Sequence, residues 1–162
     1  MISRSSPECH LYIELHPCSC GETQLPPKHK LVSSGDDLVA VYENPCPRCG
    51  TPRRFDFVLD PEIPPGLKFG GAKPSNLIDA AQFLATADHA AKQMPPTPYW
   101  MSRAVDALEE VLKFIPEGAD RVPVEALFTT AGKEMYLAEP GRFRKPRLEA
   151  VLGVYRDILA KL

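Results

Sequence analysis

The sequence predicts an α+β protein, with an N-terminal antiparallel β module at residues 8–60 and a C-terminal α-helical domain at residues 75–162. Two patterns support this division. Before residue 60, short segments alternate apolar and polar residues, which is typical of half-buried strands. After residue 75, apolar residues recur every three or four positions, which is typical of amphipathic helices. Residues 61–74 are rich in proline and glycine and predict a connector between the two parts.

The β module is expected to contain a strand, a hairpin and a second strand. Residues 10–16 alternate, with Leu11, Ile13 and Leu15 on one face, and predict the first strand. Residues 30–33 and 38–43 predict the hairpin around residues 34–36. Residues 54–59 predict the last strand.

The opposite face of the first predicted strand carries four polar or aromatic residues: His10, Tyr12, Glu14 and His16. Such a group suggests a metal site or acid–base chemistry. On a strand, however, His10 and His16 are ~20 Å apart at ~3.3 Å per residue, so they cannot share one ion without another element. We therefore interpret this face as exposed to solvent.

Four cysteines form two close pairs, each followed directly by a glycine: Cys18 with Cys20, and Cys46 with Cys49. Four soft thiolates complete the tetrahedral coordination of zinc, so the pairs predict a structural Zn²⁺ site. Disulfides and free core thiols are the alternatives. The pair spacing, and the lack of an apolar signal sequence in residues 1–7, argue against disulfides. Three other residues remain alternatives to one of the cysteine ligands: Cys9, His10 and His16.

The order strand, cysteine pair, hairpin, cysteine pair, strand resembles a zinc ribbon over residues 10–60. The first pair, Cys18-Ser19-Cys20, departs from the usual Cys-x-x-Cys spacing by one residue. Zinc ribbons bind nucleic acids, bind proteins or only stabilise a fold, so the resemblance leaves the function open.

The helical domain is expected to contain three amphipathic helices, with short helical pieces at residues 123–138. The first helix begins after Ser75 or Asn76, either of which can act as its N-cap. The second begins at Pro98, after the capping residue Thr97. The last begins near Pro146 and runs to the end of the sequence.

Basic residues gather in two places that we predict to contact a partner: Arg142, Phe143 and Arg144 before the last helix, and Arg48, Arg53 and Arg54 beside the second cysteine pair. Positive charge at a helix N-terminus is mildly unfavourable, which suggests a role other than stability. An acidic protein partner or another anion is the functional interpretation. A solvated cluster with internal ion pairs is the alternative.

The bulk composition limits the function further. The formal net charge of −2 gives no global attraction to nucleic acid or to an anionic membrane. No apolar run approaches the ~20 residues of a membrane span. Reduced cysteines fit the cytoplasm, which is the compartment we expect. Four cysteine ligands leave no open metal position for water, so we expect a protein that is not an enzyme.

Three stretches resemble uncharacterised bacterial proteins associated with polymorphic toxin gene clusters: Phe69-Gly-Gly with Pro74-Ser75 and Ile78-Asp79, residues 109–120, and residues 139–156. The resemblance implies an immunity protein, a cytoplasmic binder that masks a toxin domain. The sequence thus predicts a zinc-containing protein-binding protein of this kind. A zinc-ribbon protein that binds nucleic acid or regulates expression is the alternative.

Overall fold

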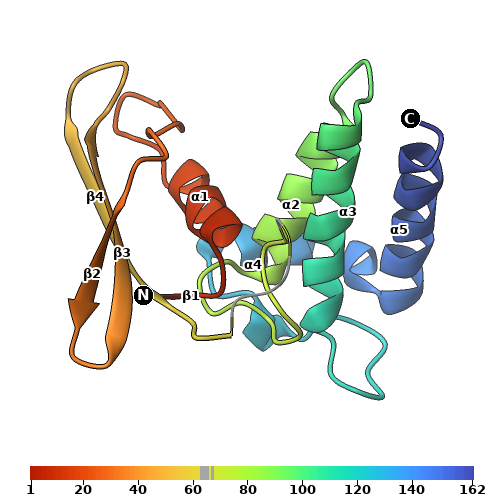
Figure 1. Cartoon of the computed structure of the whole chain (residues 1–162). Coiled ribbons are helices and arrows are strands. Elements are labelled where there is room, and N and C mark those ends of the chain that lie inside the picture. Colours follow the sequence, from red (N-terminus) through yellow and green to blue (C-terminus); the bar gives the residue numbers. More distant parts are fainter. Residues whose placement is uncertain (63–65, 67) are drawn as a thin grey trace. The chain divides into compact units, whose positions relative to one another are not determined.

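The structure is a computed structural model that describes residues 1–62, 66 and 68–162. It divides the chain into two compact units (Figure 1). The N-terminal unit comprises Met1–Gly71 and Ser75–Leu77, and the helical unit comprises Ala72–Pro74 and Ile78–Leu162. The α+β class is confirmed. Part of the predicted connector, residues 63–65 and 67, lies outside the described residues.

The N-terminal unit contains one helix and a four-stranded sheet: β1 (Ile2–Ser3), α1 (Ser6–Leu15), β2 (Lys30–Ser34), β3 (Asp37–Pro45) and β4 (Pro52–Leu59). The strand order is β1-β4-β3-β2. The predicted hairpin and last strand are confirmed as β2, β3 and β4, which pair antiparallel. The added strand β1 runs parallel to β4, so the sheet is mixed and not purely antiparallel as predicted.

The prediction of a strand at residues 10–16 is wrong, because most of this segment lies in helix α1. The helix starts where Ser5 Oγ accepts a hydrogen bond from the backbone N–H three residues later, at 3.1 Å. Pro7 lies in the first turn, where its missing N–H leaves no bond unmade. Two buried residues of the helix, Cys9 and Ile13, are four positions apart, which is the spacing of one helix face.

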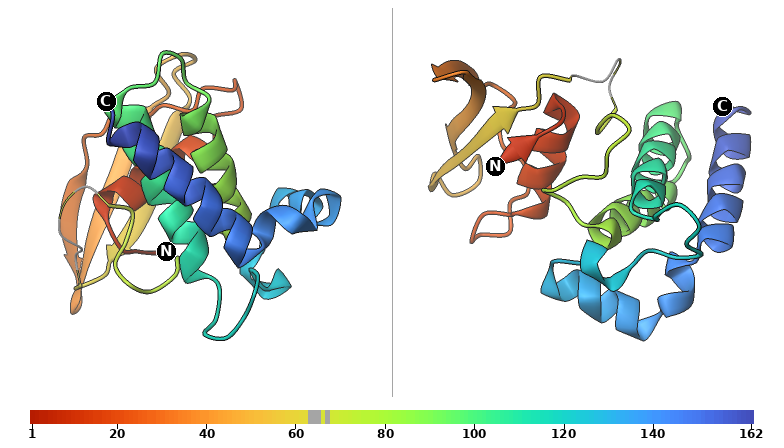
Figure 2. Two further views of the ribbon diagram at one scale, coloured as in Figure 1. Left: turned by 90° about the vertical axis from the view of Figure 1, so that its right-hand side faces the viewer. Right: turned by 90° about the horizontal axis from the view of Figure 1, so that it is seen from below.

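The core of the N-terminal unit lies between α1 and one face of the sheet (Figure 2). Cys9 and Ile13 of α1 pack there against Ala40, Tyr42 and Phe57. Ala40 and Tyr42 are two positions apart on β3, so their side chains lie on the same face of the sheet. Ala40 pairs with Phe57 in β4. This period of two fixes which sheet face is buried and which is not.

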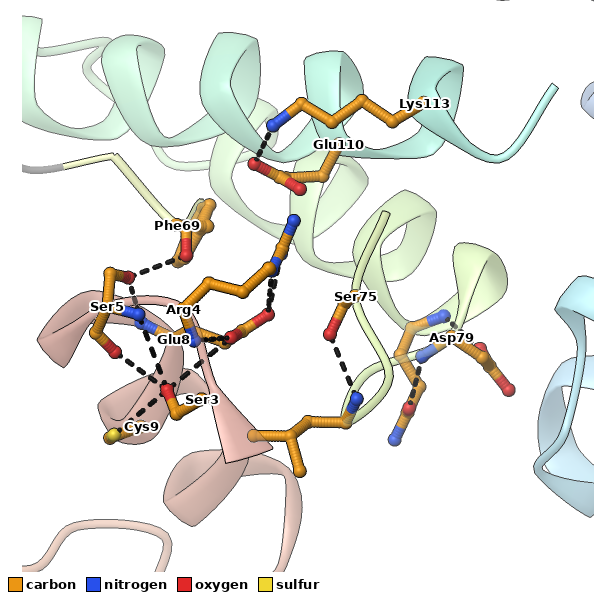
Figure 3. Close-up of polar contacts among 12 residues, drawn as sticks. Ser3, Arg4, Ser5, Glu8, Cys9, Phe69, Ser75, Asp79, Glu110 and Lys113 are labelled. Carbon is orange, nitrogen blue, oxygen red and sulfur yellow. Dashed lines mark hydrogen bonds and ion pairs between the residues drawn. The ribbon is translucent and has the colours of Figure 1, made fainter. Parts of the chain in front are cut away.

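Figure 3 shows a buried polar network at the start of α1. The fully buried Glu8 carboxylate accepts hydrogen bonds from the Arg4 backbone N–H at 2.7 Å and from the Arg4 guanidinium at 2.6 and 2.9 Å. Ser5, the N-cap, also donates a hydrogen bond to the Phe69 carbonyl at 2.6 Å. A buried carboxylate requires such a paired and hydrogen-bonded partner. The network therefore links the start of α1 to the segment around Phe69.

The helical unit contains four α-helices and two 3₁₀ helices among its described residues: α2 (Ala80–Ala91), α3 (Pro98–Lys113), η1 (Val124–Ala126), α4 (Thr130–Ala138), η2 (Pro140–Phe143) and α5 (Lys145–Leu159). The three long helices α2, α3 and α5 and the short pieces at 123–138 are confirmed. Helix α3 contacts both α2 and α5 (Figure 1). In the described part of the chain, no helix combines the length and apolar character that a membrane crossing requires.

Helix α2 begins later than predicted. Neither Ser75 nor Asn76 is its N-cap; that residue is the fully buried Asp79. Asp79 Oδ1 accepts a hydrogen bond from the Gln82 backbone N–H at 2.8 Å, and the Gln82 side chain accepts one from the Asp79 N–H at 3.0 Å. This reciprocal capping box fixes the helix start.

Asp79 also connects α2 to α4. Its Oδ2 accepts hydrogen bonds from the Thr129 backbone N–H at 2.9 Å and from the Thr129 hydroxyl at 2.5 Å. Thr129 in turn caps α4, because its Oγ1 accepts a hydrogen bond from the Gly132 N–H at 3.0 Å. A side chain at Gly132 would meet Asp79 Oδ2 at 2.6 Å, so glycine is required for this close approach.

Candidate metal centre

The four paired cysteines converge at one end of the N-terminal sheet. The Sγ atoms of Cys18, Cys20, Cys46 and Cys49 all lie within 4.8 Å of one another. Cys18 Sγ lies 3.6 Å from Cys49 Sγ, and Cys20 Sγ lies 3.6 Å from Cys46 Sγ. Two contacts of 3.6 Å therefore join the first pair to the second.

These separations fit four ligands around one ion. A tetrahedron with metal–sulfur bonds of ~2.3 Å has sulfur–sulfur edges of ~3.8 Å. A disulfide bond would require ~2.05 Å, and all four cysteines are free thiols. The four cysteines thus form a group that can hold a metal ion.

Two tight turns place the sulfurs. The first pair lies in the loop after α1, and the second lies in the turn between β3 and β4. Gly21 (φ 85°) and Gly50 (φ 74°) both adopt the left-handed conformation that other residues rarely take. The Gly50 N–H donates to the Cys46 carbonyl at 2.9 Å, and the Cys46 N–H donates to the Thr51 carbonyl at 2.8 Å. These two backbone hydrogen bonds close the turn that carries Cys46 and Cys49.

Backbone N–H groups also point at the sulfurs. The Cys20 N–H donates to Cys18 and lowers the pKa of the Cys18 thiol. The Thr51 hydroxyl, 3.2 Å from Cys49 Sγ, and the Thr51 N–H together lower the pKa of Cys49 to about 6. At Cys20 the Glu22 N–H acts in the same direction, but burial and the neighbouring thiols outweigh it and raise the pKa to about 11. A divalent cation supplies the positive charge that allows all four sulfurs to ionise.

Two arginines of the predicted partner site have structural roles beside this group. Arg53 is buried, and its guanidinium donates to the carbonyls of His16 at 2.7 Å, Ile13 at 3.3 Å and Gln24 at 3.2 Å. It therefore binds the C-terminal carbonyls of α1 instead of facing a partner. Arg48 donates to the Cys20 carbonyl at 3.2 Å and so links the two cysteine turns, while its side chain stays 64% exposed.

The three alternative ligands lie elsewhere. Cys9 is buried in the core, 3.1 Å from Ser3 Oγ, and burial raises its pKa to about 11. His16 Nδ1 lies 2.8 Å from the Tyr12 carbonyl, and its ring stacks on Tyr12. Because α1 is a helix, His10 and His16 do not lie on one face. The polar strand face predicted for residues 10–16 therefore does not form. Among the described residues, the metal-binding group contains only cysteines.

The remaining predicted partner residues are mostly engaged with acidic groups. Arg142 forms an ion pair with Asp88, and Arg144 lies 3.4 Å from Asp120. Phe143 between them is fully buried, so its ring packs in the core and does not offer the partner contact that the sequence predicts.

Arg54, in the N-terminal unit, is 55% exposed and pairs with Asp56 at 3.0 Å and Glu43 at 3.7 Å. The alternative interpretation of the basic clusters, internal ion pairing, therefore describes Arg54, Arg142 and Arg144.

Sequence reasoning missed the groups that support the cysteines. Thr51 and Glu22 lie two residues after the last cysteine of each turn, where their N–H groups reach a sulfur. That fixed offset is a usable sequence signal. Arg53 carried no such signal, because two of its carbonyl partners, Ile13 and His16, lie at the end of α1, which was predicted as a strand.

Comparisons with protein-family models, with curated proteins and with solved structures find no match for this chain. The resemblances to zinc ribbons and to proteins of toxin gene clusters therefore receive no support from these comparisons.

Proposed function

We propose that this protein is a non-enzymatic, zinc-containing protein-binding protein in which Zn²⁺ stabilises the N-terminal unit. The observation that carries the proposal is the convergence of Cys18, Cys20, Cys46 and Cys49 with sulfur separations that match a tetrahedral site. Four thiolates suit zinc better than magnesium or calcium, which prefer oxygen ligands. They also occupy every position of a four-coordinate ion, as in structural and not catalytic sites.

The ion pairs of the basic clusters favour a protein partner over nucleic acid. Phosphate binding requires cations that are free to neutralise phosphates. Arg54, Arg142 and Arg144 each already face a carboxylate. Arg48 and Arg144 are more than half exposed and remain candidates for polar contacts at the rim of a protein interface.

The helical unit offers a stronger anchor near the turn between α2 and α3. Met94 is 80% exposed and Tyr99 is 64% exposed. The Tyr99 ring contacts the Trp100 ring edge-on at 4.9 Å, and the His89 ring contacts Trp100 at 6.3 Å. Tyrosine, tryptophan and methionine are enriched at interfaces, and aromatic residues dominate the binding energy of many of them. We assign the main partner contact to this surface.

Neutralisation of a cognate bacterial toxin is the more specific form of the proposal. It is supported by the resemblance of the stretches around residues 69–79, 109–120 and 139–156. An immunity protein requires a tight and specific surface and no catalytic group of its own, which agrees with a metal that only stabilises the fold. A nucleic-acid-binding protein is the second candidate.

Calorimetric titration of the purified protein with the product of the neighbouring gene tests this function. We expect binding that Tyr99→Ala weakens at least ~10-fold, the effect of losing a hot-spot contact of ~1.4 kcal/mol or more. Leu137→Ala, at an apolar residue of α4 that is 80% exposed, is the matched control and should bind normally. A salt-sensitive complex with duplex DNA or RNA tighter than ~1 μM, and no protein binding, would instead support the second candidate.

A further inference from the structure

A cavity of about 300 Å³ lies in the helical unit and is lined mainly by helices α2 and α5, which both contact α3 (Figure 1). Asp88 and Lys92 line it four residues apart at the end of α2, and Arg147, Val151 and Tyr155 follow the same spacing on α5. The apolar part of the lining consists mainly of buried leucines: Leu84, Leu108 and Leu148. Proteins often bind small molecules in cavities between helices, and this volume lies at the lower end of their range.

Two lining side chains, Arg142 and Tyr155, have hydrogen-bond donors available to a ligand. Arg142 forms its ion pair with Asp88 through Nη2, and its side chain is only 19% exposed. Among the described residues, its Nε and Nη1 groups have no hydrogen-bond partner, and the Tyr155 hydroxyl has none either. Burial and the nearby Asp88 carboxylate raise the pKa of Tyr155, so its hydroxyl stays protonated at neutral pH and is able to donate. These donors suit an acceptor group on a ligand.

The charges of the lining favour an anion over a cation. In the described part of the chain, the side chains of Lys92 and Arg147 have no ion-pair or hydrogen-bond partner. Arg142 and Asp88 neutralise each other, and Glu139 is the other acidic residue of the described lining. Two cations, Lys92 and Arg147, against the single carboxylate of Glu139 leave a net charge of +1. A ligand with one negative charge balances this charge.

We propose that this cavity binds a small organic carboxylate, with the anionic group on the cations and the apolar body on the leucines. The N–H groups of a guanidinium match the two oxygens of a carboxylate, which makes arginine a preferred partner for this group. A phosphate monoester fits less well, because its charge of about −1.5 to −2 at neutral pH exceeds the net charge of the lining. The inference goes beyond the proposed function, because the cavity contains neither a cysteine ligand nor a residue of the surface around Met94 and Tyr99.

Titration of the full chain with acetate, hexanoate and phenylacetate, followed by two-dimensional ¹H–¹⁵N NMR, provides the test. We expect saturable shifts of the α2 and α5 amides around the cavity, with a dissociation constant for phenylacetate or hexanoate below ~5 mM, the affinity of about ten well-placed non-hydrogen atoms. Acetate should bind at least ~10-fold more weakly than hexanoate, because it lacks the apolar body. The absence of saturable shifts with all three carboxylates up to ~20 mM would overturn the proposal.

Charge is tested on the ligand and on the protein. Phenylacetamide, which has the same ring and no charge, should bind at least ~5-fold more weakly than phenylacetate, and so should phenylacetate to the variant Arg147→Gln. Arg156→Gln is the matched control and should bind normally. Arg156 lies nine residues later on α5, on the opposite side of the helix, and pairs with Glu109. Equal weakening by both arginine variants, or equal affinity for the amide, would contradict a carboxylate site.

A variant of the opposite sign tests the charge balance of the lining. Glu139→Gln removes the unpaired carboxylate and raises the net charge of the lining from +1 to +2. We expect it to strengthen phenylacetate binding at least ~2-fold, because the ligand no longer meets a like charge. The NMR spectrum of each variant shows whether the helical unit is intact. Unchanged or weaker binding by a folded Glu139→Gln protein would show that the anionic group does not bind in this cavity.

Discussion

At the scale of single residues, the N-terminal unit contains a buried and closely packed ion pair between Arg4 and Glu8. Arg4 and Glu8 expose only 9% and 1% of their side chains. A Cβ atom at Gly70 would meet the Arg4 guanidinium carbon at 2.3 Å, whereas one at Gly71 would meet nothing within 4 Å. Packing therefore requires glycine at position 70 but not at position 71.

We expect Gly70→Ala to lower the free energy of unfolding by ~1–3 kcal/mol, the usual range for overpacking. The added methyl group forces the Arg4 guanidinium away from the Glu8 carboxylate. Gly71→Ala should change stability by less than ~0.5 kcal/mol. Urea unfolding of both variants, followed by circular dichroism, measures the difference. Equal stabilities would show that Arg4 moves freely.

The reactivity of the buried Cys9 should report on the folding of the N-terminal unit. In the folded, reduced protein Cys9 is buried, and burial raises its pKa to about 11. Iodoacetamide attacks the thiolate, so Cys9 should react slowly at neutral pH in the zinc-loaded protein. A chelator that removes zinc should speed its alkylation, because the unfolded unit exposes the thiol. Mass spectrometry of the labelled peptide measures both rates, and equal rates with and without zinc would contradict this expectation.

At the scale of elements, Arg53 connects β4 to the end of α1 and to the loop of the first cysteine pair. Its guanidinium binds carbonyls in both segments. We expect Arg53→Ala to destabilise the N-terminal unit by ~2–3 kcal/mol, because buried carbonyls lose a charged donor. Arg54→Ala is the matched control, since Arg54 is 55% exposed and its surface ion pairs contribute little.

The destabilisation of the N-terminal unit by Arg53→Ala can be measured as the rate at which the protein transfers its metal to a chromophoric chelator. Faster release from Arg53→Ala than from Arg54→Ala is the expected result. Equal rates would show that Arg53 does not hold the two segments together.

Much of the element structure follows from local sequence signals. The hairpin, the last strand and the three long helices were predicted because each has a clear period and a proline or glycine at its ends. Helix α1 was missed because Leu11, Ile13 and Leu15 alternate as in a strand. The Ser5-x-x-Glu8 pattern with Pro7 at the helix start was the better signal. The parallel strand β1 has only two residues and is fixed by its pairing with β4, which no local pattern shows.

The candidate site was predictable to a similar degree. The cysteine ligands follow from their spacing, because two short turns suffice to place them. The basic residues were harder to interpret. Whether an arginine faces solvent, an acidic neighbour or a buried carbonyl depends on segments distant in sequence, as with Arg142 and Asp88 or Arg53 and His16.

At the scale of the whole molecule, the metal ligands and the single tryptophan lie in different units. The four cysteines belong to the N-terminal unit, and Trp100 belongs to α3 in the helical unit. Metal-binding energy is folding energy in small modules of this kind. Removal of zinc should therefore unfold the N-terminal unit selectively, with loss of amide protection in β3 and β4. Protection of α2 and α3, and the fluorescence of Trp100, should change little.

The most direct test of the account is the metal content of the folded, reduced protein, measured by elemental analysis on the wild type and on Cys49→Ser. We predict one zinc per chain in the wild type. The variant should lose most of its zinc and, by hydrogen exchange, the protection of the N-terminal sheet. A wild-type protein that contains no metal and yet keeps this sheet protected would contradict the central claim.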